Sequence, residues 1–168
     1  MAAGSTYTPI ATTTLGSAVS SYTFSSIPST YTDLVLEMSG STSGSINNTI
    51  RVGNGSVDIG TNYSCTILSG NGSTAVSTRR LNDTSFQPNY NGYTTTGQSD
   101  MTVYFQQYAN TSVYKPILSR SNNAATGVDL VGGTWRSFSA INTIQLLANG
   151  GYNWQVGTTF TLWGILNA

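Results

Sequence analysis

Apolar side chains recur at every second residue of this chain, in short runs that are separated by turn residues. The clearest run is residues 33–39, where Leu34, Leu36 and Met38 share one face and Glu37 lies on the other. Successive side chains of a strand point to opposite faces, so a period of two indicates a half-buried β-strand. No segment has a convincing helical period. The expected strands cover residues 10–15, 19–24, 33–39, 49–52, 63–68, 75–81, 101–108, 113–120, 141–147 and 158–166.

Many short strands between turns favour an antiparallel sandwich or barrel. We predict an all-β fold, an antiparallel two-sheet sandwich, with residues 10–168 as its single domain. Gly16 and Ser17 indicate a type II′ hairpin between the first two strands. Pro116 indicates an edge strand or a bulge, and one helical turn at residues 137–140 can precede the strand at 141–147. The expected core comprises Leu34, Leu36, Met38, Phe105, Ile144, Leu146, Phe160 and Leu162.

The first nine residues are predicted to form an extended arm outside the sandwich. Residues 1–9 lack sustained alternation, and Pro9 cannot donate a ladder hydrogen bond. Tyr7 and Ile10 are the apolar side chains with which such an arm would contact a neighbouring subunit.

Side chains suited to catalysis are scarce. The chain has no histidine, one cysteine and 7% charged residues, which removes Ser/His, Cys/His and His-metal sites. Asp33 and Glu37 are four residues apart on one strand, so they lie about 13 Å from each other. This separation is wider than that between the two catalytic carboxylates of a glycosidase. Cys65 fits a buried strand thiol, and residues 54–58 fit a turn better than a calcium loop. We therefore predict a protein that is not an enzyme and that needs no cofactor or metal.

The charge of the chain also limits its partners. Six Lys or Arg residues balance six Asp or Glu residues, and no basic run occurs. Binding to nucleic-acid phosphates needs a basic patch, so no nucleic-acid partner is expected. No apolar run is long enough to cross a membrane, and the N-terminus does not look like a signal peptide, so no membrane partner is expected either.

Loop aromatics are the remaining candidates for recognition. Residues 82–100 form the longest irregular stretch, and long loops are usually functional or mobile. Exposed Tyr and Trp side chains stack on sugars or anchor protein interfaces, although packing over the ends of the sandwich is the plainer interpretation. The candidate partner contacts are Tyr7, Pro9, Ile10, Tyr90, Tyr93 and Trp154.

Two stretches of the chain resemble a known family when they are taken together. The first is residues 22–34, Tyr-Thr-Phe-Ser-Ser-Ile-Pro-Ser-Thr-Tyr-Thr-Asp-Leu. The second combines Trp-Arg-Ser at 135–137, Ile-x-x-Ile at 141–144 and Phe-Thr-Leu-Trp-Gly-Ile at 160–165, with Asn-Tyr-Ser at 62–64 and the 108–115 stretch between. Over most of residues 10–166 the chain resembles small virion proteins of tailed bacteriophages. It departs from them at Trp163, where the family has tyrosine.

The resemblance implies a jelly-roll-like β-sandwich in the virion, assembled in the host cytoplasm. It also implies a homo-oligomer, a trimer, bound to the major capsid protein. On this basis we expect a capsid cement or decoration protein that binds the outer capsid surface and stabilises the shell. The alternative is a tail-fibre or appendage module that binds host glycans. No catalytic residues come with the resemblance.

Overall fold

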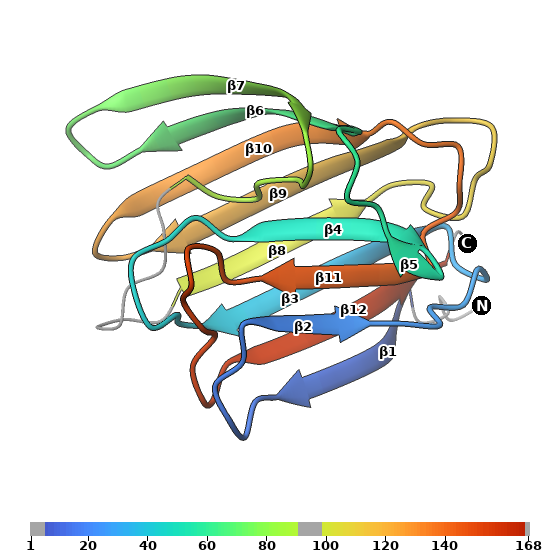
Figure 1. Cartoon of the computed structure of the whole chain (residues 1–168), viewed down its shortest axis with the longest axis horizontal. Coiled ribbons are helices and arrows are strands. Elements are labelled where there is room, and N and C mark those ends of the chain that lie inside the picture. The colour runs from blue at the N-terminus through green and yellow to red at the C-terminus, as the bar shows by residue number, and fades with distance from the viewer. Residues whose placement is uncertain (1–5, 91–98, 167–168) are drawn as a thin grey trace.

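The computed structural model describes residues 6–90 and 99–166, which form twelve β-strands and no helix (Figure 1). None of these residues therefore belongs to a helix long and apolar enough to cross a membrane. The strands are β1 (Tyr7–Thr14), β2 (Ser21–Phe24), β3 (Asp33–Gly40), β4 (Thr49–Asn54), β5 (Ser56–Val57), β6 (Tyr63–Gly70), β7 (Ala75–Asp83), β8 (Ser99–Phe105), β9 (Lys115–Asn123), β10 (Gly127–Trp135), β11 (Thr143–Leu147) and β12 (Thr159–Ile165).

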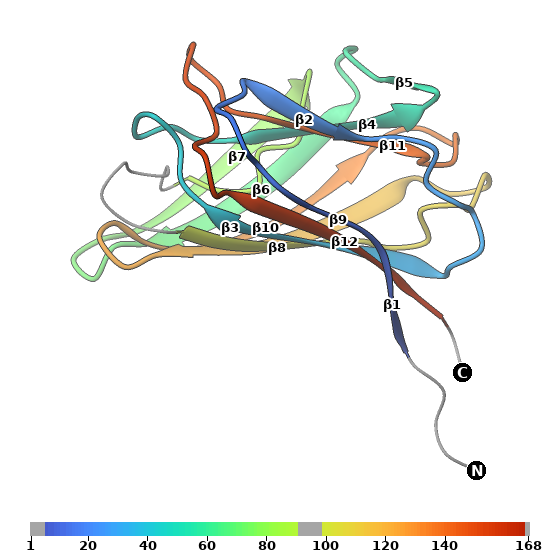
Figure 2. The ribbon, with the colours of Figure 1, turned by 90° about the horizontal axis from the view of Figure 1, so that it is seen from below.

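The strands form two antiparallel sheets. The larger sheet has eight strands in the order β1-β12-β3-β8-β9-β10-β6-β7, and the smaller has four in the order β2-β11-β4-β5. Figure 2 shows the two sheets stacked face to face, and Figure 1 shows that β6 and β7 extend beyond the smaller sheet. The predicted antiparallel, jelly-roll-like two-sheet sandwich is confirmed.

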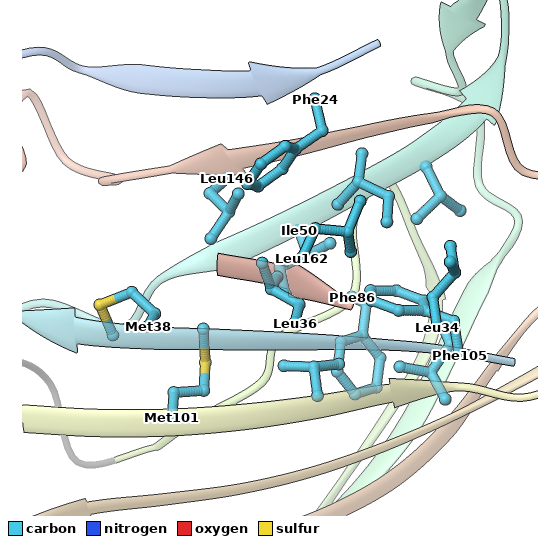
Figure 3. Packing of buried hydrophobic residues seen from close by; sticks show 14 of the residues in the cluster. Phe24, Leu34, Leu36, Met38, Ile50, Phe86, Met101, Phe105, Leu146 and Leu162 are labelled. Atoms are coloured by element: carbon cyan, nitrogen blue, oxygen red, sulfur yellow. The ribbon is translucent and has the colours of Figure 1, made fainter. Parts of the chain in front are cut away.

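The core lies between the sheets, where the inward side chains of both meet (Figure 3). All eight predicted core residues are at most 2% exposed. In β3, for example, Leu34, Leu36 and Met38 face inward because the strand alternates, and they meet Phe24 and Leu146 from the smaller sheet. The period of two therefore identified the buried face of each of these strands correctly.

Tyr63 links the two sheets through its buried hydroxyl group. The side chain belongs to β6 of the larger sheet, and its hydroxyl accepts a hydrogen bond from the Val52 N–H of β4 at 2.9 Å. The same hydroxyl lies 3.0 Å from the Val52 carbonyl oxygen and 3.1 Å from that of Asp58, to which it can donate. Burial raises the pKa of Tyr63, so the hydroxyl stays protonated.

The predicted hairpin at Gly16 and Ser17 is wrong. β1 pairs with β12 and β2 pairs with β11, so the two strands lie in different sheets. Gly16 does not have the positive φ that a type II′ turn requires. The connection instead follows the C-terminal segment, because Leu15 N–H donates to Thr158 O and Val19 N–H donates to Trp154 O. Long-range pairing has overridden the local turn signal.

The predicted arm is also wrong where the structure describes it. β1 begins at Tyr7, which pairs with Ile165 of β12, and Pro9 lies opposite Trp163. The register shifts between Pro9 and Ala11, and such a bulge lets an edge strand contain a proline. The domain boundary predicted at residue 10 therefore cuts through a strand, and residues 1–5 lie outside the described residues.

Pro116 does not mark an edge strand, because β9 lies in the sheet interior between β8 and β10. The proline is the second residue of β9, before the first pair with β8 at Ile117, so it displaces no bond of that ladder. The sequence pattern missed β10, whose alternation is interrupted by Gly132 and Gly133. A Cβ at Gly133 would lie 2.6 Å from a backbone oxygen, so close packing explains that glycine. Residues 137–140 contain no helical turn.

The predicted irregular stretch 82–100 begins with a buried segment rather than an open loop. β7 continues to Asp83, and Phe86 then exchanges two backbone hydrogen bonds of 2.8 Å with Ile50 of β4. The carbonyl of Pro88 accepts a hydrogen bond from Ser119 Oγ at 2.6 Å. These contacts place the segment alongside β4 and against β9, where its polar groups find partners within the protein.

Candidate interaction surface

The candidate contacts on β1 lie together at one edge of the larger sheet. Tyr7 is 45% exposed, and its ring meets Trp163 edge-on with centroids 6.3 Å apart. Pro9 is exposed, whereas Ile10 is half-buried and packs against the core. Tyr7 and Pro9 are therefore available to a partner, but as part of the sheet and not as a separate arm.

The candidate aromatic residues in or near loops differ from one another in exposure. Trp154 is fully buried and meets Phe160 edge-on at 5.2 Å, so the prediction that it contacts a partner is wrong. Its neighbours in sequence are turn residues, but isolated bridges to Val19 and Thr42 hold it inside the sandwich. Tyr90 is exposed, and its N–H donates to Asp129 Oδ2 at 2.9 Å. Tyr93 lies outside the described residues.

The solvent-facing side of the eight-stranded sheet, hereafter the outer face, carries apolar side chains that sequence reasoning did not single out. Leu118, Val128, Leu130 and Leu68 are 41–60% exposed and come from the adjacent strands β9, β10 and β6. Leu130 lies opposite Leu68 in the β10–β6 pairing. Scattered apolar residues are normal on a protein surface, but a contiguous group marks an interaction site.

A sequence signal for these residues was present. Ile67-Leu68, Ile117-Leu118 and Leu130-Val131 are adjacent apolar pairs inside strands. Because successive side chains of a strand point to opposite faces, each pair must place one apolar residue in the core and the other outside. In all three pairs the leucine is the exposed member.

These side chains border a shallow hollow of about 700 Å³. Its lining includes Leu68, Val128 and Leu130, together with Gly70 and Ala75. Gly70 leaves open space where a side chain would stand. The hollow is therefore a place where an apolar group of another molecule can pack against three side chains at once.

Aromatic side chains occupy the other half of the outer face. Trp163 of β12 and Tyr104 of β8 are both partly exposed and flank Val35 of β3. Val35 points outward yet is only 1% exposed, because its large neighbours surround it. Trp163 Nε1 donates to Glu37 Oε2 at 2.9 Å, which fixes both side chains on the surface.

Charges on the outer face are segregated by sign. On β9, β10, β6 and β7 the outward charged residues are Arg120 and Arg79, which lie opposite Thr102 and Thr66. On β1, β12, β3 and β8 they are Asp33, Glu37 and Asp100. We call these four-strand groups the cationic half and the anionic half. In the described part of the chain the one ion pair is Arg80–Asp83, so neither half is neutralised by ion pairing within this face.

A polar trough joins the two halves. It has a volume of about 460 Å³ and is lined by Arg120 on one side and by Asp100 and Thr102 on the other. A second trough, of about 290 Å³, continues from Asp100 toward Glu37 and Thr161. The outer face thus runs from an apolar hollow to a polar, acidic region.

The outer side of the smaller sheet has a different character. Its outward side chains on β2, β4 and β11 are polar, with Leu147 as the exception, and it holds no large exposed apolar side chain. Those polar positions include Thr23, Thr49, Arg51 and Gln145. Of the two sheets, the larger therefore carries the exposed apolar surface.

The carboxylates of the described residues do not form a metal-binding group. Within residues 6–90 and 99–166, no three Cys, Asp or Glu side chains are close enough to hold a metal ion. The carboxylate of Asp58 accepts hydrogen bonds from Gly60 N–H, Asn62 Nδ2 and Trp135 Nε1 at 2.7–2.8 Å. Burial raises its pKa, but these three bonds outweigh that effect, so the pKa of Asp58 lies below its usual value. Residues 54–57 belong to the β4–β5 hairpin, and these three bonds hold Asp58 just after it.

Two further side chains with reactive groups, those of Cys65 and Lys115, are buried inside the fold. Cys65 is a buried strand thiol, as predicted, and burial raises its pKa, which disfavours the reactive thiolate. Lys115 is fully buried at the start of β9, and its Nζ donates to the carbonyl oxygens of Val113 and Ser137. Burial lowers the pKa of Lys115. Its two hydrogen bonds are to backbone carbonyl groups, and they link two loops.

No protein-family model and no curated protein matches this sequence. Among solved structures, the alginate lyase Aly36B is similar over 82% of this chain and 72% of the lyase, with 10% identity and a TM-score of 0.31. A double mutant of that lyase in complex with alginate tetrasaccharide is similar over 96% of this chain and 75% of the lyase, with 11% identity and the same TM-score. So low a similarity carries no information about the chemistry of this chain.

Proposed function

We propose that this protein is a bacteriophage capsid decoration protein, a structural subunit of the virion and not an enzyme. The family resemblance in the sequence is the source of the proposal. The all-β fold is compatible with it, and so is a surface that has few charges and one adhesive side.

The observation that carries the proposal is the contrast between the two sheet surfaces. An exposed apolar hollow with a volume of about 700 Å³ lies on the larger sheet, whereas the smaller sheet presents polar side chains. A decoration subunit needs this arrangement, because one side packs against other proteins while the other faces solvent. In this function the larger sheet is buried in the assembly, among neighbouring copies and the major capsid protein.

Copy number in the virion tests the proposal. Quantitative mass spectrometry of purified virions should find the chain at hundreds of copies, comparable to the major capsid protein. Shells assembled without the chain should bind purified protein added back and should then withstand heating to a higher temperature. A handful of copies per particle, located on the tail, would contradict a decoration role.

A glycan-binding module of a tail fibre is the second candidate, and one feature favours it. Trp163 and Tyr104 are partly exposed beside Glu37 and the hydroxyl group of Thr161. Aromatic faces next to hydrogen-bonding groups suit the alternating apolar and hydroxyl surfaces of sugars. Binding to a glycan array that Trp163→Ala abolishes would favour this candidate over decoration.

The proposal that the protein is not an enzyme has its own test. Purified protein should leave host polysaccharide uncleaved. Cleavage that a single carboxylate substitution abolishes, at Glu37 or Asp100 for example, would overturn it.

A further inference from the structure

We propose that two copies of this chain pair along the free edge of β7, in an antiparallel register centred on Thr78, and so join their larger sheets into one. β7 is the last strand of the eight-stranded sheet, and Figure 1 shows no described segment along its free edge. The proposal adds to the decoration role and does not depend on it.

β7 is the longest open edge of the two sheets. Of the other edge strands, β1 contains Pro9 and a register shift, β2 has four residues and β5 has two. β7 has nine residues and no proline, and its pairing with β6 is regular from Ala75 to Arg80. Such an edge presents a row of N–H and C=O groups to which another strand can bond.

The turn between β6 and β7 shows which groups of β7 face the free edge. Asn71 N–H donates to Thr74 O at 3.2 Å, so these two residues form a hydrogen-bonded pair. Hydrogen-bonded pairs alternate with non-hydrogen-bonded pairs along an antiparallel ladder. Even-numbered residues from 76 to 80 therefore bond to β6, whereas odd-numbered residues from 75 to 79 direct their N–H and C=O groups to the free edge. Within the part of the chain that the structure describes, no backbone group bonds to these edge groups.

A two-fold axis at Thr78 lets β7 of a second copy bond to these groups. Odd-numbered residues then lie opposite odd-numbered residues, and the whole of residues 75–81 is paired. Ser77 meets Arg79 of the other copy, and every such pair occurs twice in a two-fold interface. The two strands thereby gain about eight backbone hydrogen bonds.

The side chains favour this register over its neighbours. Moving the axis one or two residues toward the C-terminus would place Arg79 or Arg80 opposite its own copy, where like charges repel. Moving it the other way shortens the paired segment, because the turn at residues 71–74 intervenes. With the axis at Thr78, each Arg79 lies opposite a serine, and Arg80 keeps its ion pair with Asp83 at 2.6 Å.

Pairing along an edge leaves the outer face of each copy open. The two-fold axis stands perpendicular to the joined sheet, so both outer faces point the same way. Ala75 lines the apolar hollow, and it lies opposite Leu81 of the second copy, which is 59% exposed in the single chain. The hollow is therefore extended across the junction and not covered. A dimer of this kind presents two apolar hollows side by side, as a decoration subunit that binds a shell requires.

A register-specific cross-link tests the proposal with the full-length protein. Thr78 meets its own copy in a non-hydrogen-bonded pair, in which the Cα atoms are about 4.5 Å apart. A disulfide spans Cα separations of roughly 4.4–6.8 Å. Under mild oxidation Thr78→Cys should therefore be cross-linked to twice the 17.7 kDa mass of the chain.

Val76→Cys is the matched control on the same strand and the same side. In the proposed register the two copies of residue 76 lie about 13 Å apart along the strands, so this variant should cross-link at least about tenfold more slowly. The wild-type chain should not cross-link, because its one cysteine, Cys65, is buried.

Analytical ultracentrifugation of variants without an added cysteine measures the association itself. The wild-type chain should be a dimer, and Ser77→Pro should weaken the dimer about tenfold or more, because two backbone hydrogen bonds are lost. Ser77→Ala keeps the N–H group and should dimerise like wild type. Thr78→Arg places like charges on the axis and should abolish the dimer, whereas Ser73→Arg in the exposed turn should not. Circular dichroism should show that every variant keeps its β-structure.

Several outcomes would overturn the proposal. Equal cross-linking of Thr78→Cys and Val76→Cys would exclude the register, and a wild-type monomer at every concentration would exclude the dimer. A trimer, which the family resemblance implies, or a dimer of Ser77→Pro as tight as wild type would also overturn it. These experiments use purified protein without shells, so their failure leaves the decoration proposal standing. Absence of the chain from virions would likewise leave the dimer standing.

Discussion

Replacing Tyr63 with phenylalanine tests whether one hydroxyl group holds the two sheets together. The Tyr63 side chain is fully buried, and its hydroxyl accepts from the Val52 N–H at 2.9 Å and lies 3.0 Å from the Val52 carbonyl oxygen. Tyr63→Phe keeps the ring in place and removes only this oxygen. The Val52 N–H is then left buried without a partner, because the site is closed to solvent.

The expected cost follows from two contributions. The Val52 N–H, as a buried donor without a partner, costs about 1–3 kcal/mol. The loss of the hydrogen bond that the hydroxyl donates to a carbonyl oxygen adds about 0.5–1.5 kcal/mol. We therefore expect Tyr63→Phe to lower the free energy of unfolding by about 2–4 kcal/mol, measured by urea denaturation with an unchanged m-value.

Tyr22→Phe is the matched control. The Tyr22 hydroxyl lies 2.6 Å from Thr13 Oγ1 and is only partly buried, so Thr13 can bond to water in the variant. Its cost should stay below about 1 kcal/mol. If Tyr63→Phe is as stable as Tyr22→Phe, the hydroxyl does not hold the sheets together and the reasoning is wrong.

Three further outcomes are expected. Phe105→Ala should cost about 3–5 kcal/mol in the same urea assay, because it leaves a cavity in the core between the sheets; a loss under about 1 kcal/mol would contradict the packing described. Because hydrogen bonds keep the folded pKa of Asp58 below the unfolded 3.8, its contribution to stability is present above that pH and lost as pH falls through the folded pKa. Urea midpoints measured from about pH 5 downward should fall less steeply for Asp58→Asn than for wild type, and equal slopes would refute this. Cys65 should react with a thiol reagent at least about a hundredfold more slowly in the native than in the urea-unfolded protein, and fast native labelling would show that it is not buried.

The local pattern was sufficient for most of the strands and for the buried faces of β3, β8, β11 and β12. Leu34, Leu36 and Met38 are buried because a strand alternates its side chains, whatever its neighbours are. The same pattern failed at β10, where Gly132 and Gly133 carry no side chain to alternate. It also left unused the signal in pairs such as Ile67-Leu68, which indicate a strand with two apolar faces.

The candidate contacts were less predictable than the core. Trp154 lies among turn residues in the sequence, yet it is fully buried. Its environment depends on Val19 and Thr42, which are more than a hundred residues away in the chain. The local sequence shows that an aromatic residue lies near a turn, but the burial of that residue depends on which distant segments cover it.

The sequence by itself determined the fold class, the buried faces of four strands and the scarcity of catalytic side chains, because these follow from backbone geometry and residue chemistry. Only the tertiary structure decided that β1 pairs with β12 and β2 with β11. It also decided that Arg120 and Asp100 lie on opposite halves of one surface, since that depends on the order of the strands in the sheet. Strand order is a non-local property, because it is set by which pairings bury the most apolar surface over the whole chain.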